Sequence, residues 1–109
     1  MAETLQRYVD SVVDDAGREF EARACGAEMP DGLWHGWIEF IPIGLGAPIR
    51  SPRETTQPNR TDAVYWASGL SRVYLEGALR RAQMGPIVIV PSASPRPIFD
   101  APAPRTSTE

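Results

Sequence analysis

The sequence has one cysteine, one histidine and no lysine, and these shortages exclude several kinds of site. Cys25 and His35 cannot complete a structural zinc site, which needs about four Cys or His ligands. A single cysteine also cannot form a disulfide within the chain, which fits a reducing compartment. We therefore expect no metal and no cofactor.

Long apolar runs are absent as well. The longest apolar stretch, residues 40–49, is interrupted by two prolines and two glycines, whereas a membrane-spanning helix needs about 20 apolar residues. The N-terminus also lacks the basic start and apolar run of a signal peptide. These observations predict a cytoplasmic protein that does not contact a membrane.

The charges are divided unevenly along a chain of 109 residues, a length that fits one domain. Residues 1–40 hold nine acids and three arginines, whereas residues 41–82 hold six arginines and three acids. All eleven basic residues are arginines, and a guanidinium can bind a carboxylate or a phosphate through two hydrogen bonds. Either the two halves complement each other within the domain, or the second half binds an anionic partner.

The first half of the chain has the pattern of strands. Residues 19–25 alternate between apolar and charged side chains, as in a half-buried antiparallel strand. Turn residues at 15–17 connect this segment to residues 5–13, and the Met-Pro-Asp-Gly turn at 29–32 connects it to the aromatic run 33–41. Residues 5–13 also fit a helical stripe, but the turn at 15–17 favours a strand, so three antiparallel strands are predicted.

Two further segments complete the predicted fold. Residues 49–57 contain Pro52 and polar neighbours, which suit a fourth strand at the edge of the sheet. After Pro58 the apolar period changes to that of two short helices, the first capped by Asn59 or Thr61 and the second by Ser71. The apolar stripes of these helices are Ala63, Trp66, Ala67 and Leu70, and then Leu75, Ala78, Leu79 and Ala82.

The sequence thus predicts an α+β domain over residues 1–85. A three- or four-stranded antiparallel sheet comes first, and two short helices follow and pack on one face of it. Residues 86–109 contain six of the eleven prolines and little apolar surface to offset the entropy of ordering. They are predicted to form a mostly flexible tail.

The densest polar cluster lies at the junction between the edge strand and the first helix, residues 53–60. Side-chain donors there adjoin the free amides of a helix N-terminus, which is a recurrent anion-binding arrangement. The alternative is a set of capping and turn residues that satisfy their own backbone. With two nearby rings, the candidate ligand-binding residues are Arg53, Glu54, Thr56, Gln57, Asn59, Arg60, Trp37 and Trp66.

Glu39 lies within the aromatic run, where a charge needs a partner to offset its desolvation. We expect an ion pair between Glu39 and an arginine of the second half that ties the sheet to the helices. A general base is the alternative reading. His35 lies on the same face of the strand but roughly 13 Å away, so the two cannot form a hydrogen-bonded acid/base pair.

Four runs of the sequence resemble short bacterial proteins of unknown function. They are WHGWIEF at residues 34–40, RETTQP at 53–58, YWASGL at 65–70 and YLEGAL at 74–79. The resemblance spans residues 8–82 and implies no activity and no functional residue. It suggests that residues 83–109 are an accessory extension.

We predict a small non-enzymatic binding module whose partner is a protein or a small anionic ligand, held by residues 53–60. One alternative is an enzyme that uses Glu39 or Glu54 as acid/base in a pocket lined by Trp37 and Trp66. A second alternative is a single-stranded nucleic-acid binder, which the acidic first half disfavours. In each case the protein is a monomer, or a homodimer formed through the exposed sheet edge.

Overall fold

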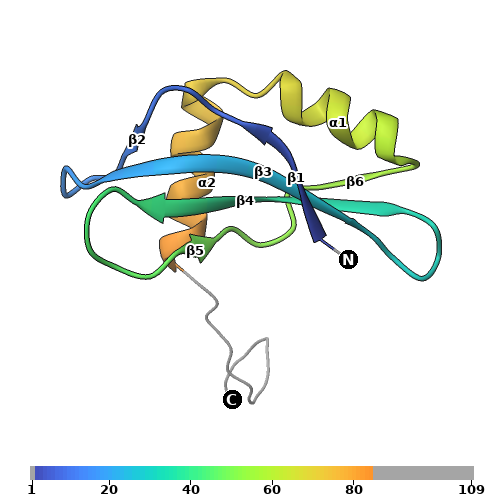
Figure 1. The fold of residues 1–109 in the computed structure, drawn as a ribbon, viewed down its shortest axis with the longest axis horizontal. Coiled ribbons are helices and arrows are strands. Elements are labelled where there is room, and N and C mark those ends of the chain that lie inside the picture. The colour runs from blue at the N-terminus through green and yellow to red at the C-terminus, as the bar shows by residue number, and fades with distance from the viewer. Residues whose placement is uncertain (1, 85–109) are drawn as a thin grey trace, which may run out of the picture.

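All strands precede the helices along the chain, as predicted (Figure 1). The computed structural model describes residues 2–84, and the predicted tail over residues 86–109 lies outside this range. Within the described range, the elements are β1 (Ala2–Arg7), β2 (Val12–Val13), β3 (Glu19–Glu28), β4 (Trp34–Pro42), β5 (Ile49–Arg50), β6 (Thr55–Gln57), α1 (Arg60–Ser68) and α2 (Arg72–Met84). The predicted α+β class is confirmed.

The strands form one antiparallel sheet in the order β1-β3-β4-β5, with β2 beside β3 and β6 beside β4. The prediction of three or four strands holds for the four main strands, but residues 2–84 contain six in all. One reason is that the predicted edge strand, residues 49–57, is divided into β5 and β6. Pro52 lies in the interruption, where it has no N–H to donate to the strand ladder.

The predicted turns are formed where glycine can adopt a positive φ. Gly17, with φ 84°, closes the turn before β3, and Gly32, with φ 85°, closes the hairpin between β3 and β4. In the hairpin, the Gly32 amide donates to the Met29 carbonyl at 2.8 Å. The hairpin sets the register that places Cys25 opposite Trp37 and Ala22 opposite Phe40.

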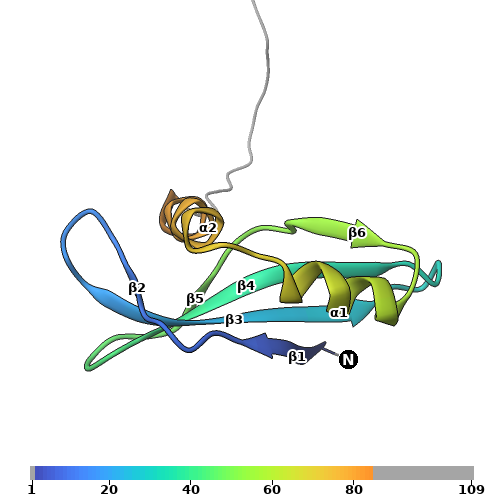
Figure 2. The ribbon, with the colours of Figure 1, turned by 90° about the horizontal axis from the view of Figure 1, so that it is seen from above.

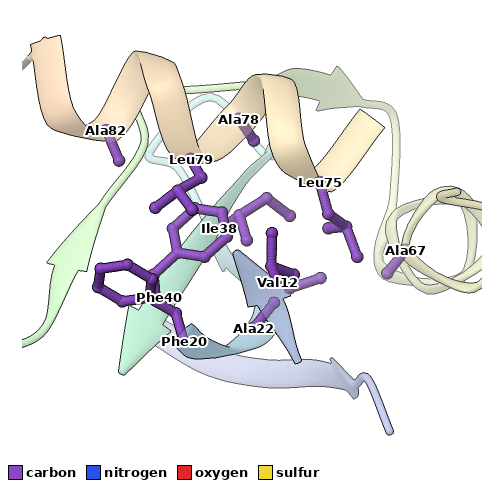
Figure 3. Close-up of a cluster of buried hydrophobic side chains, with 11 residues drawn as sticks. Val12, Phe20, Ala22, Ile38, Phe40, Ala67, Leu75, Ala78, Leu79 and Ala82 are labelled. Atoms are coloured by element: carbon purple, nitrogen blue, oxygen red, sulfur yellow. The ribbon is translucent and has the colours of Figure 1, made fainter. Parts of the chain in front are cut away.

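Both helices lie on one face of the sheet (Figure 2), and α2 crosses β3 and β4 (Figure 1). The core between them contains the alternate side chains of β3 and β4 together with the predicted stripe of α2 (Figure 3). Phe20 and Phe40 meet edge to face, with their ring centroids 6.4 Å apart. The buried core residues are Val12, Phe20, Ala22, Ala24, Ile38, Phe40, Ala67, Leu75, Ala78, Leu79 and Ala82.

The helix boundaries follow the capping residues. Asn59 caps α1, because its side-chain oxygen accepts a hydrogen bond from the Asp62 amide at 2.8 Å. Gly69 follows the last residue of α1, and Ser71 caps α2 by accepting from the Tyr74 amide at 3.2 Å. Neither helix within residues 2–84 is long and apolar enough to cross a membrane.

The opposite face of the sheet has no helix over it in the described part of the chain (Figure 2). A second, small apolar cluster lies there, formed by Cys25, Ala27 and Trp37 with Met29 against it. Alternation along the strands explains the division, because neighbouring residues of one strand point to opposite faces. Trp37 is therefore separated by the sheet from the core beneath the helices.

Candidate functional site

Residues 51–54 form the outer wall of the candidate site, where the chain leaves the sheet between β5 and β6. Ser51 is buried, and its amide and hydroxyl make hydrogen bonds of 2.8 and 3.0 Å with the Ile38 backbone of β4. At the other end, the Glu54 amide donates to the Gly36 carbonyl at 2.7 Å. These bonds fix both ends of the segment to β4 and leave Pro52 and Arg53 exposed at its apex.

The Glu54 carboxylate points from this segment toward α2. It accepts two hydrogen bonds from Arg81, at 2.7 and 3.0 Å, and one from the Tyr74 hydroxyl at 2.6 Å. The Glu54 side chain is 4% exposed, whereas that of Arg81 is 43% exposed. The network therefore buries the carboxylate and leaves one edge of the Arg81 guanidinium toward solvent.

The network also controls the protonation of its members. Burial opposes the charge of Glu54, but the hydrogen bonds from Arg81 and Tyr74 outweigh it and hold the pKa of the carboxyl below its usual value. Burial and the hydrogen bond to Glu54 raise the pKa of Tyr74 to about 12. At neutral pH, Glu54 is thus an ionised acceptor whose two oxygens are both occupied.

A hollow of about 440 Å³ lies between residues 49–53 and the C-terminal half of α2. Three arginines are among its lining residues, and the rest of the lining is mostly apolar. We call this hollow the arginine groove, and it is lined by Ile49, Arg50, Ser51, Pro52, Arg53, Arg81 and Ala82.

The three arginines of the arginine groove differ in their partners. Arg81 is neutralised by Glu54. Arg50 stacks on Trp37, with its guanidinium carbon 4.4 Å from the ring centroid, and within residues 2–84 neither Arg50 nor Arg53 takes part in an ion pair. The Arg50 guanidinium therefore lies with Trp37 on the face opposite the helices, and Arg53 is the groove arginine whose charge lacks both a carboxylate and a ring partner among the described residues.

The other predicted polar residues of the junction do not join Arg53. Arg60 donates two hydrogen bonds to Glu3 of β1, at 2.9 and 3.0 Å, and does not line the arginine groove. Asn59 caps α1, Gln57 donates to the Thr55 hydroxyl at 2.7 Å, and Thr56 lies exposed in β6 opposite His35. The expectation that both arginines share one anion site is therefore corrected.

Trp37 and Trp66 lie on opposite faces of the sheet. A Cβ added at Gly36 would come 2.7 Å from the Trp66 ring, so Trp66 covers Gly36 on the helix face. Trp37 is the next residue of β4, and it points to the other face, where it is 6% exposed. The pocket predicted between these two rings is therefore not formed.

The predicted ion pair between Glu39 and the helices is also wrong. Glu39 lies on the face opposite the helices, where its register partners are Arg23 of β3 and Arg50 of β5. Cys25 is buried on the same face, and burial and then the nearby Glu39 charge raise the pKa of its thiol to about 11. The thiol is therefore protonated at neutral pH and unsuited to act as a nucleophile.

Sequence reasoning missed Arg50, Tyr74 and Arg81 as members of the site. One available signal was the seven-residue spacing of Tyr74 and Arg81, which places both on the same side of a helix. The pairing of that side with Glu54 depends on how α2 crosses the sheet, which no local pattern specifies. Arg50 was missed because β5 has two residues, and so short a strand has no alternating pattern to show on which face of the sheet each side chain lies.

Among residues 2–84, no group of three or more His, Cys, Asp or Glu side chains is arranged to hold a metal ion. No protein-family model, curated protein or solved structure matches the chain.

Proposed function

We propose that the protein is a small binding module that holds an acidic segment of a partner protein in the arginine groove. The observation that carries this proposal is that Arg53 and Arg81 both line the groove, where Arg81 is held by Glu54 and Arg53 has no carboxylate partner among the described residues. Arginine favours carboxylates because its planar donors match the two carboxylate oxygens.

The apolar walls of the groove favour a peptide over a bare anion. Ile49, Pro52 and Ala82 line the groove together with Arg53 and Arg81, so a segment that alternates acidic and aliphatic side chains could satisfy both kinds of contact. The volume of about 440 Å³ lies at the lower end of the range for small-ligand pockets and accommodates a few side chains. β5 is also the last strand of the main sheet order, and an edge strand can pair with an added extended segment.

Binding is a better account of the groove than acid/base catalysis. A general base needs a carboxylate that can reach a substrate proton and has a pKa near the working pH. Glu54 is 4% exposed, its oxygens accept from Arg81 and Tyr74, and its pKa is lowered. This arrangement supports a positioning role, in which Glu54 holds Arg81 at the groove.

The experiment is a fluorescence-anisotropy titration of a labelled peptide that alternates Glu and Leu. Wild type is expected to bind it, and Arg53→Ala is expected to weaken binding about tenfold, since a charge-assisted hydrogen bond contributes about 1.5–3 kcal/mol. Arg72→Ala is the matched control, because Arg72 is exposed on α2 and does not line the groove. The control is expected to bind as wild type does.

Three results would overturn the proposal. Equal affinity of wild type and Arg53→Ala would remove the groove as the site. Binding of citrate as tight as that of the peptide, with full displacement of the peptide at saturating citrate, would show a small-anion site instead. Tighter binding of a single-stranded oligonucleotide than of the peptide, with a steep loss of affinity at higher salt, would favour a nucleic-acid binder.

A further inference from the structure

We propose that the protein has a second interaction surface, at the end of the sheet where β4 passes into β5. Three large apolar side chains are exposed there: Val9 at 99%, Ile43 at 59% and Leu45 at 100%. We call these three residues the loop patch. None of them lines the arginine groove.

The backbone of the β4–β5 connection presents Leu45 to solvent. Gly44 and Gly46, on either side of Leu45, have φ values of 109° and 127°, which few residues other than glycine adopt readily. The Ile43 amide donates to the Glu19 carbonyl of β3 at 3.0 Å, which anchors the start of the connection. Leu45 therefore lies at the tip of a connection with a defined backbone path.

Separate segments of the chain meet at the loop patch. Ile43 and Val9 line a hollow of about 260 Å³ together with Tyr8, Asp10, Ser11 and Glu21. Ile43 and Leu45 line a second hollow, of about 390 Å³, together with residues 17–20 and Pro42. Because Ile43 lines both hollows, the two depressions adjoin at this residue, with Val9 beside one and Leu45 beside the other.

Exposed apolar residues are common when they are scattered, so their number alone does not identify a site. Tyr65 and Val73 of the helices are exposed too, but neither lines these hollows. What distinguishes the loop patch is convergence, because residues 8–11 and Ile43 are distant in sequence and share a depression. Apolar side chains beside a depression are typical of protein interaction sites.

The charges around the loop patch indicate the chemistry of its partner. Asp10, Glu19 and Glu21 line the two hollows, and Arg18, the one basic residue in their walls, is paired with Asp14 at 3.0 Å. An acidic rim around an apolar centre fits a protein segment that places aliphatic anchors next to Arg or Lys. A second copy docked patch to patch would set acidic rims against each other, and an anionic membrane would be repelled.

The test uses the full chain labelled with ¹⁵N and a peptide that alternates Leu and Arg. The peptide is expected to shift the amide resonances of Val9, Ile43 and Leu45. Leu45→Ser and Val9→Ser are each expected to weaken binding about tenfold or more, because each removes the burial of one large apolar side chain. Val73→Ser and Arg53→Ala are matched controls that should bind as wild type, the latter because the arginine groove is a separate site. Circular dichroism checks that the variants fold.

Several results would overturn the inference. If Leu45→Ser binds the peptide as tightly as wild type does, charge attraction alone explains the binding and the apolar site is excluded. Undiminished binding of a peptide with Ser in place of Leu would lead to the same conclusion. Sedimentation of wild type as a dimer and of Leu45→Ser as a monomer would make the occupant a second copy. Stronger binding to phosphatidylglycerol vesicles than to the peptide would make it a membrane.

Discussion

The Arg81 guanidinium binds both oxygens of the Glu54 carboxylate, at 2.7 and 3.0 Å, and thereby joins the last turns of α2 to the segment between β5 and β6. The Tyr74 hydroxyl donates to the same carboxylate from two turns earlier on the helix. This contact fixes one wall of the arginine groove against the other. The geometry of the groove and the stability of the fold are consequently linked through one buried carboxylate.

Replacing Glu54 with Gln should lower the free energy of unfolding by about 2 kcal/mol. The amide has the size of the carboxylate but no charge, so Arg81 and the Tyr74 hydroxyl lose a charged acceptor. The partial exposure of Arg81 keeps the loss below that of a fully buried pair. Urea denaturation followed by circular dichroism measures the change. Glu28→Gln, at an exposed position, is the control and should be neutral.

The same carboxylate predicts a loss of stability in acid. The pKa of Glu54 in the folded protein lies below its ordinary value of 4.5, so its ionised form stabilises the fold above that value. The contribution disappears as the pH falls below 4.5 and through the folded pKa. The urea concentration at the midpoint of unfolding should therefore fall less steeply with decreasing pH for Glu54→Gln than for wild type. Asp14, whose pKa is also lowered, accounts for part of the remaining slope.

Two tyrosines predict a loss of stability in alkali. Burial raises the pKa of Tyr8 from 10.0 to about 12, and burial together with Glu54 raises that of Tyr74 from 10.0 to about 12. A raised folded pKa means that stability is fully present below pH 10 and is lost as the pH rises toward 12. In a titration with base, the absorbance of the Tyr8 and Tyr74 phenolates should therefore appear above pH 10, at the pH where the protein unfolds. Tyr8→Phe should remove part of this effect and lose the hydrogen bond to the Ala67 carbonyl.

Gly36→Ala should destabilise the protein by about 1–3 kcal/mol because of overpacking. The added Cβ would lie 2.7 Å from the Trp66 ring and 2.9 Å from the Thr55 methyl, so α1 or β6 must shift. Gly77→Ala is the comparison, since the new Cβ would meet the end of the Arg81 side chain at 3.3 Å and helix propensity favours Ala by about 1 kcal/mol. Thermal denaturation should show a lower midpoint for the first variant and no decrease for the second.

Local patterns in the sequence account for most of the fold. The alternation in residues 19–25, the glycines of the two turns and the caps at Asn59 and Ser71 each specify structure within a few residues, and all are confirmed. The division of the edge strand was missed, although Pro52 was recognised as unsuited to a central strand. The reason is that Ser51 and Glu54 bond to β4 on either side of the interruption, which depends on register and not on composition.

The candidate site was less accessible to sequence reasoning. Arg53 and Glu54 were identified, but their neighbours in space are Arg50 and Arg81, not Arg60. Proximity in the chain suggested that residues 53 and 60 act together. However, β6 carries the chain away from the groove before α1 begins, and Arg60 meets Glu3 of β1 there. The partner of Glu54 is Arg81, which the long-range packing of α2 brings to it. A single sequence contains little information about such packing.

The most direct test of the arginine groove is to map the Glu-Leu peptide onto the ¹⁵N-labelled protein by its amide shifts. Binding in the groove predicts saturable shifts at Arg50, Ser51, Arg53, Arg81 and Ala82, and their loss in Arg53→Ala. Shifts centred on Asn59, Arg60 and Glu3, or none at all, would contradict the account.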